Sequence, residues 1–157
     1  MTKESWDELE QFKCSLREYF KTLNKVVAFF ERNYRSSHAQ INVVAIEESL
    51  EWQIKNALDD KSEEYNLEME TLPKLTEATQ LPERGAYFVA ELPNNTTMIT
   101  RKMKFFPLHF GREVFCAENV LNCEQKIDWK TCQLSVEEET RIVKEFRSDF
   151  APFNFTK

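Results

Sequence analysis

Three polar side chains at alternate positions form the one candidate catalytic site in the sequence. His38, Gln40 and Asn42 are separated by Ala39 and Ile41. On a β-strand, residues two apart lie on the same face, about 7 Å from one another. The two carboxamides can donate hydrogen bonds to a phosphate or a base, but an amide nitrogen lacks the basic lone pair of a nucleophile. The alternative is a strand whose polar face simply meets solvent.

A second set of candidates combines cations with aromatic rings. All members of this set lie within positions 101–112 of the chain: Arg101, Lys102, Lys104, Phe105, Phe106, His109 and Arg112. Such cations can hold phosphate while an exposed ring stacks on a base, which makes this stretch a candidate RNA-binding site. The alternative places Phe105 and Phe106 in the core and the cations along a solvated strand edge. Arg32 and Arg35, which precede His38, are candidate phosphate-binding residues as well.

Other kinds of catalytic or metal site find little support. The two histidines, His38 and His109, have no activated serine context with which to form a Ser-His-Asp arrangement. The four cysteines, at positions 14, 116, 123 and 132, include no C-x-x-C pair. We therefore expect reduced thiols, with Cys116 and Cys132 buried, and neither a metal nor a cofactor. Only two glycines occur in the chain, which excludes glycine-rich phosphate loops.

The charge of the chain is concentrated in one segment. The net charge is −6, and residues 47–70 alone carry nine acidic and two basic residues. The remainder is almost neutral, which argues against a protein that coats nucleic acid but is compatible with a local basic patch. No apolar run approaches the roughly 20 residues of a membrane span. The N-terminus also lacks the apolar core of a signal peptide.

The hydrophobic pattern predicts an α+β fold in which antiparallel hairpins pack with helices. In the first half of the chain, the expected elements are a helix over 5–23, a hairpin of strands 26–30 and 38–46, a helix over 49–61 and a short strand near 67–69. An irregular loop is expected over 71–85. It is followed by a hairpin of strands 86–92 and 96–104, a helix ending near 121 and a helix over 135–150. Capping boxes at Ser5 and Ser135 open the first and last helices. We expect Trp129 to be a packing plug and the tail 152–155 to return to the body.

The first constellation resembles the histidine-triad pattern, His-φ-His-φ-His-φ-φ, of nucleotide hydrolases and transferases. In that family the middle histidine attacks the α-phosphorus and the flanking histidines position phosphate. His38 matches the first position, Gln40 the nucleophile and Asn42 the third. The resemblance therefore implies a degenerate triad from which family-type nucleotidyl transfer is absent.

Several uncommon sequence motifs follow one another along the chain: Phe29–Gln40, Gly85–Val89, Phe106–Val114, Asp128–Cys132, Glu145–Arg147 and Phe150–Phe155. Together they resemble CwfJ-type proteins, eukaryotic splicing-associated factors with a degenerate histidine-triad domain. The resemblance covers residues 8–156. It implies that 1–46 form the end of a histidine-triad-like domain and 47–157 a CwfJ-like C-terminal domain. It also implies a fragment, because a complete triad domain has upstream strands and larger members carry an N-terminal metallophosphoesterase-like region.

The resemblance implies a role rather than a reaction. Members are associated with late intron-lariat spliceosomes and with the lariat-debranching enzyme. We therefore expect a non-catalytic interaction module that modulates lariat debranching and intron turnover, in the nucleus or also in the cytoplasm. Its expected partners are spliceosomal or debranching proteins and branched intron RNA, with no membrane. The alternatives are a nucleotide-binding or residually hydrolytic triad relative that uses His38, Gln40 and Asn42, and a purely structural domain.

Overall fold

The computed structural model describes residues 1–156 and confirms the α+β expectation. Within those residues, five antiparallel strands form one sheet in the order β2-β1-β4-β5-β3. The strands are β1 (Lys25–Asn33), β2 (Asn42–Glu47), β3 (Glu70–Pro73), β4 (Tyr87–Glu91) and β5 (Thr96–Thr100). The main helices are α1 (Lys3–Lys21), α2 (Glu51–Glu64), α3 (Phe110–Phe115) and α4 (Val136–Phe150). Both expected hairpins, β1–β2 and β4–β5, are present.

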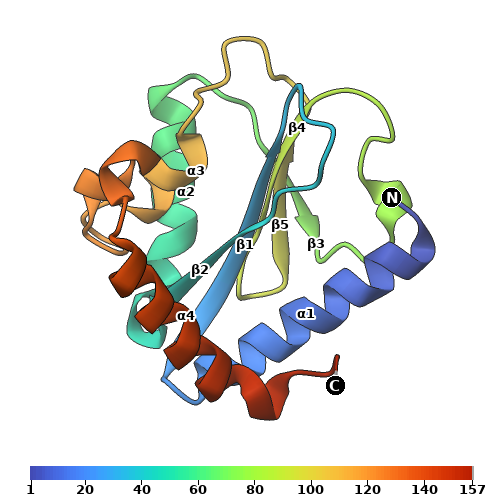
Figure 1. Cartoon of the computed structure of the whole chain (residues 1–157). Coiled ribbons are helices and arrows are strands. Elements are labelled where there is room, and N and C mark those ends of the chain that lie inside the picture. The colour runs from blue at the N-terminus through green and yellow to red at the C-terminus, as the bar shows by residue number, and fades with distance from the viewer. Residues whose placement is uncertain (157) are drawn as a thin grey trace.

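Helices cover both faces of the sheet (Figure 1). Helix α1 lies against one face, α2 and α3 lie against the other, and α4 runs past β2 toward the end of α1. The last residues then return along α1, where the rings of Phe12 and Phe155 lie 4.6 Å apart. Tyr19 of α1 meets three rings from the end of the chain: Phe146, Phe150 and Phe153. The predicted return of the tail to the body is therefore confirmed.

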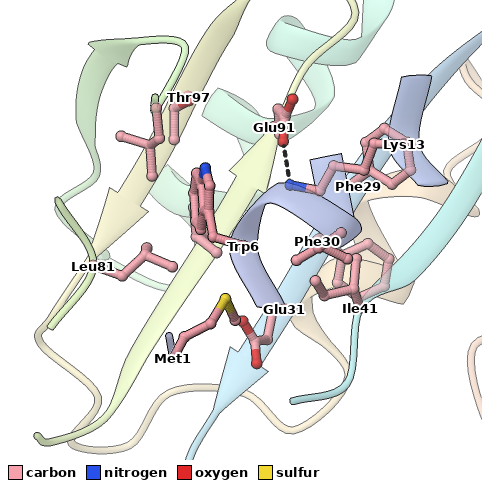
Figure 2. A pocket seen from close by; sticks show the side chains of 13 residues that line it. Met1, Trp6, Lys13, Phe29, Phe30, Glu31, Ile41, Leu81, Glu91 and Thr97 are labelled. Carbon is pink, nitrogen blue, oxygen red and sulfur yellow. Dashed lines mark hydrogen bonds and ion pairs between the residues drawn. The ribbon is translucent and has the colours of Figure 1, made fainter. Parts of the chain in front are cut away.

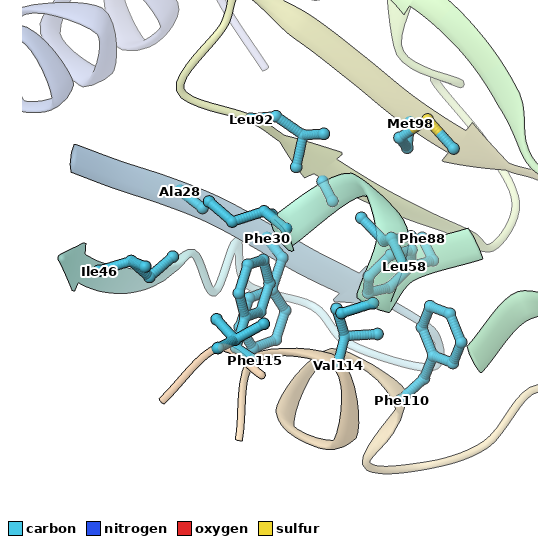
Figure 3. Close-up of a cluster of buried hydrophobic side chains, with 14 of the residues drawn as sticks. Ala28, Phe30, Ile46, Leu58, Phe88, Leu92, Met98, Phe110, Val114 and Phe115 are labelled. Atoms are coloured by element: carbon cyan, nitrogen blue, oxygen red, sulfur yellow. The ribbon is translucent and has the colours of Figure 1, made fainter. Parts of the chain in front are cut away.

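The face beneath α2 and α3 holds the hydrophobic core (Figure 3). Alternate residues of β1 and β4 point into this layer, because successive strand side chains lie on opposite faces. Phe30 stacks on Phe115 of α3, with ring centroids 5.4 Å apart, and Phe88 meets Phe110 edge-on at 5.1 Å. Leu58 of α2 is fully buried against them. The apolar side predicted for this helix is thus the side that faces the sheet.

Gly111 allows α3 to approach β1 closely. A Cβ at this position would lie 2.3 Å from Cε2 of Phe30, a separation that side chains do not tolerate. Gly111 does not serve a backbone conformation that is closed to other residues. Instead, Gly111 lies within an ordinary helix, and Gly85 is the glycine with positive φ, at 100°. The missing side chain is what matters at Gly111.

The first hairpin differs from the prediction at its turn. Strand β2 begins only at Asn42, so His38 and Gln40 lie in the connecting loop. Arg35 has a φ of 52°, and the Ser36 hydroxyl donates to the carbonyl oxygen of His38 at 2.7 Å. These local features favour a turn over an extended strand. The prediction that residues 38, 40 and 42 share one strand face is therefore wrong.

The boundaries of several other elements also differ from the predicted ones. Thr2, and not Ser5, caps α1, because the Thr2 side chain accepts the N–H of Ser5. Strand β3 lies partly within the segment expected to be irregular. Strand β5 ends at Thr100, and α3 stops six residues before its expected end near 121. The capping box at Ser135 is confirmed, with Ser135 and Glu138 bonding each other's backbone N–H groups.

Helix α4 is less covered than its spacing predicted. The helical spacing of apolar residues over 135–150 predicts that Ile142 and Val143 face inward, but both are exposed, and Val136 is 75% exposed. Only the last turns of the helix meet α1, through Phe146 and Phe150. Over the described residues, no helix is both long enough and apolar enough to cross a membrane.

Candidate functional site

A surface cavity of about 290 Å³ lies where the loop of the first hairpin meets the start of α3. We name it the hairpin groove. Its polar lining comes from Arg32, Ser36, Gln40, Asn42, His109 and Arg112. Its aromatic and apolar lining comes from Tyr34, Leu108 and Trp129 at the surface, with Phe30, Phe88 and Gly111 behind them.

The hairpin groove brings the two predicted sets of residues together. Arg32, Gln40 and Asn42 come from the first hairpin, whereas His109 and Arg112 come from the basic and aromatic stretch seventy residues later. The packing of α3 on β1 explains the meeting, because His109 precedes α3 directly and Arg112 lies in its first turn. The sequence offered no signal that these segments meet.

Arg112 lines the hairpin groove and has no ion-pair partner among the described residues. Within residues 1–156, Arg112 forms no ion pair with its neighbour Glu113. Glu113 instead accepts the hydroxyl of Tyr65 at 2.7 Å, a bond that raises the pKa of Tyr65 to about 12. Arg112 Nη2 lies 4.0 Å from Sγ of Cys132. The residues that line the groove include no carboxylate, so its cations are available to an anion.

Arg32 and Asn42 supply donors on the hairpin side. The guanidinium of Arg32 lies 4.9 Å from the centre of the Tyr34 ring, and its buried Nε has no hydrogen-bond partner. A buried donor without a partner costs about 1–3 kcal/mol, which a bound acceptor would relieve. The Asn42 amide donates to the carbonyl oxygen of Phe30 at 3.4 Å. Arg35 stacks on the same Tyr34 ring from 5.1 Å but does not line the groove.

Trp129 stands at the surface of the groove and is not the packing plug that the sequence predicted. Its side chain is 54% exposed. It belongs to a single 3-10 turn that Asp128 caps by accepting the N–H of Lys130. A lone tryptophan among polar residues, with no apolar partner at helical spacing, was a signal for this exposure. Cys132, at the end of the same turn, is only partly buried, in contrast to the expectation.

His38 lies in a different cavity. That cavity, about 630 Å³, is also lined by Glu31, Glu83 and Tyr87. The Tyr87 hydroxyl donates to Glu31 at 3.0 Å. Burial raises the pKa of Glu31, and burial together with this carboxylate raises the pKa of Tyr87. The structure therefore separates His38 from Gln40 and Asn42, the other two positions of the degenerate triad.

The remaining cations of the basic stretch lie outside the hairpin groove. Lys102 pairs with Glu68, and Lys104 lies 5.4 Å from the centre of the Phe105 ring. Arg101 is exposed beside them. Phe105 is 90% exposed, so only Phe106 occupies the core position expected of both rings. Phe105 lies on a turn and has a positive φ of 60°.

A third and smaller cavity lies between α1 and the sheet (Figure 2). Trp6 and Lys13 of α1 point toward the strands, where Lys13 pairs with Glu91 at 2.8 Å and Thr97 lies close by. Its volume of about 40 Å³ suits one or two water molecules rather than a ligand. This cavity belongs to the packing of α1.

The chemistry of the hairpin groove suits binding. Guanidinium groups hold phosphate, exposed rings stack on bases, and carboxamides bond base edges. Gln40, at the position matched to the triad nucleophile, has no basic nitrogen with which to attack phosphorus. Across residues 1–156, no three His, Cys, Asp or Glu side chains gather as metal ligands would.

Two family models match the chain. The family described as "Protein similar to CwfJ C-terminal" matches residues 1–58, and "Protein similar to CwfJ C-terminus 2" matches residues 51–156. CWF19-like protein 1 homologs are 54% identical over 99% of the chain in Drosophila melanogaster and 40% identical over 96% in Caenorhabditis elegans. CWF19-like protein 1 of Homo sapiens is 38% identical over 99%. The chain spans 29%, 28% and 30% of these proteins, respectively.

Proposed function

Because this chain belongs to the CwfJ C-terminal family, we propose that it is a non-catalytic interaction module of a nuclear, splicing-associated factor. In this proposal it binds branched intron RNA in the hairpin groove and protein partners of late intron-lariat spliceosomes elsewhere, and so modulates debranching and intron turnover. One observation carries the RNA contact: Arg32, Arg112 and Trp129 converge on a groove with no carboxylate in its lining.

The geometry supports a single-stranded or branched segment rather than a duplex. An exposed indole stacks on a base only when that base is free of its own stack, as at a branch or in a loop. Arg112 and Arg32 would then hold the adjoining phosphates, and Gln40 would reach a base edge or phosphate oxygen. Residues 47–70 carry nine acidic and two basic residues, which argues against a general nucleic-acid coat, and none of them lines the groove.

The test is the anisotropy of a labelled branched intron RNA, with a linear RNA of equal length as the reference, at two salt concentrations. We expect micromolar or tighter binding that prefers the branch and weakens with salt, because phosphate contacts release counterions. Arg112→Gln should reduce the salt slope by about 1. Trp129→Ala should weaken binding by about 1–3 kcal/mol, the usual range for one stacked base.

The matched control removes charge outside the hairpin groove. Arg101→Ala with Lys104→Ala takes away two exposed cations that do not line it. If this double variant flattens the salt dependence more than Arg112→Gln does, the strand end and not the groove holds the RNA. If the parent chain binds neither RNA at low salt, the module docks proteins only.

A nucleotide-binding or hydrolytic triad relative is the second candidate, and His109 is the observation that favours it. Its imidazole lines the hairpin groove together with Gln40 and Asn42. We expect Gln40→His to create no turnover of a nucleotide monophosphoramidate, because Gln40 lies on a loop and its triad partner His38 lies in another cavity. Turnover well above that of the parent, lost again in Gln40→His with His109→Ala, would establish this second function.

A further inference from the structure

Two cysteines meet at the C-terminal end of α3. Cys116 is the residue at which the helix ends, and the backbone N–H of Cys123 donates to its carbonyl oxygen at 3.0 Å. Besides burial, the neighbouring Cys123 side chain raises the pKa of the Cys116 thiol, so the two side chains lie near each other. A backbone bond of this kind holds the two Cα atoms within about 4.4–6.8 Å, the range that disulfides span.

The intervening loop holds the two cysteines in place. Leu121 donates to the carbonyl oxygen of Phe115 at 3.2 Å, and Asn122 donates to that of Ala117 at 2.9 Å. Asn122 has a φ of 49°, a conformation that Asn tolerates and that turns the chain back toward the helix. The backbone therefore fixes the approach of Cys123 to Cys116.

The two thiols differ in reactivity. Cys116 is 7% exposed, and burial raises the pKa of its thiol to about 12. Cys123 is partly exposed. Because the thiolate is the reactive form and needs access to its oxidant, Cys123 reacts first. Cys132, the third thiol nearby, donates to the carbonyl oxygen of Lys126 at 3.6 Å.

We propose that Cys116 and Cys123 are a reversible oxidation site that closes as a disulfide on exposure to a small disulfide such as oxidised glutathione. The Cys123 thiolate attacks one glutathione sulfur, which forms a mixed disulfide and releases one glutathione thiolate. That thiolate takes the proton of Cys116, whose sulfur then attacks Cys123 and displaces the second glutathione. In sum, two protein thiols and one oxidised glutathione give one protein disulfide and two reduced glutathiones.

The test is peptide mapping after equilibration in glutathione buffers of set oxidised-to-reduced ratio, followed by alkylation and trypsin digestion. Both cysteines fall on the peptide 113–126, between Arg112 and Lys126, whereas Cys132 falls on 131–141. The disulfide therefore appears as one unalkylated peptide that has lost two hydrogens. We expect at least ten-fold more of this product than of glutathione on the exposed Cys14, and its loss on adding dithiothreitol.

Variants test the order of attack. In Cys116→Ser, Cys123 should accumulate as the glutathione mixed disulfide, because its resolving thiol is gone. In Cys123→Ser, Cys116 should stay reduced, whereas Cys132→Ser and Cys14→Ser should leave the product unchanged. Circular dichroism checks that each variant is folded. A dominant link from Cys132 to either cysteine, or modification of Cys14 alone, overturns the proposal.

Discussion

The two faces of the sheet are covered in opposite ways. Beneath α2 and α3 the contacts are aromatic and dry: Phe30, Phe88 and Phe110 interlock with no charged group among them. Beneath α1, Lys13 is buried and binds Glu91 at 2.8 Å, and Arg17 binds the same carboxylate. The α1 face therefore adds paired charges to apolar contacts such as those of Trp6 and Phe29, whereas the other face is packed by apolar side chains.

The difference teaches which face responds to conditions. Burial of apolar area depends little on salt or pH, whereas ion pairs are screened by salt and titrate. The α1 face also buries Glu31, hydrogen-bonded to Tyr87, and the unpartnered hydroxyl of Thr97. We therefore expect salt and pH to act on the attachment of α1 and to spare the core beneath α2 and α3.

The largest expected effect comes from Phe110→Ala in the dry face. Phe110 is fully buried and meets Phe88 and Phe106 edge-on, so its loss leaves a cavity. The free energy of unfolding should fall by about 3–5 kcal/mol, equally at low and high salt. Urea denaturation measures it. Val136→Ala, at an exposed position, should change the value by less than about 0.5 kcal/mol.

Gly111→Ala should act on the same face by crowding. The added methyl group would meet the ring of Phe30, which must move and disturb its stack on Phe115. We expect a loss of about 1–3 kcal/mol in urea denaturation. Partial recovery in Gly111→Ala with Phe30→Leu would identify the ring as the obstacle. Unchanged stability in the single variant would show that the approach of α3 is looser than the structure indicates.

On the charged face, Lys13→Met should lower the free energy of unfolding by less than Phe110→Ala does, and the loss should depend on salt. Glu91 keeps Arg17 as a partner, so the loss should be about 1–2 kcal/mol, below the 3–5 typical of a buried charge left alone. The difference in the free energy of unfolding between variant and parent should become smaller in about 1 M salt. Lys3→Met, which removes an exposed pair with Asp7, should have almost no effect. A salt-independent loss would assign Lys13 a packing role.

The smallest effect is expected from Glu31→Gln, and it depends on pH. Burial raises the pKa of Glu31 in the folded chain above the ordinary value of 4.5, so the folded form favours the protonated carboxyl. The parent therefore loses stability as pH rises from about 4.5 through that raised pKa. Glu31→Gln should raise Tm by a few degrees at pH 7, where about 1 kcal/mol corresponds to roughly 2–4 °C, and by less at pH 4.

Tyr87→Phe is the matched variant for testing this dependence of stability on pH. It removes the hydroxyl that donates to Glu31 and should steepen the loss of stability with rising pH. If Glu31→Gln instead lowers Tm at pH 7, the attraction of Lys13 and the hydrogen bonds to the carboxylate outweigh its burial.

The sequence predicted the dry face better than the charged face or the groove. Strands with apolar residues at period two and helices with apolar residues at helical spacing place Ile54, Leu58 and Phe88 in the core from local pattern alone. The burial of Lys13 was not predictable, because it depends on Glu91, 78 residues away, as well as on Glu10 of the same helix. Local pattern does not encode which distant strand a helix will cover.

The hairpin groove shows the same limit at a binding surface. Arg32, Gln40, Asn42, His109 and Arg112 were all candidates from residue type and resemblance, but their meeting depends on the packing of α3 against β1. His38 was misplaced because alternation of polar residues predicts a strand even where a turn begins. Trp129 and Phe105 were misassigned because large rings are usually buried, whereas these two lie on turns.

The sheet order has a consequence for how such a chain is inherited. Strand β1, in the stretch matched by the first family model, pairs with β4, in the stretch matched by the second, from Phe29 opposite Glu91 to Asn33 opposite Tyr87. A recombination event between the two stretches would strip β1 of that neighbour and expose a row of unpaired N–H and C=O groups, the kind of edge that aggregates. The two stretches therefore form one unit of genetic exchange, and we expect them to be duplicated, moved or lost together.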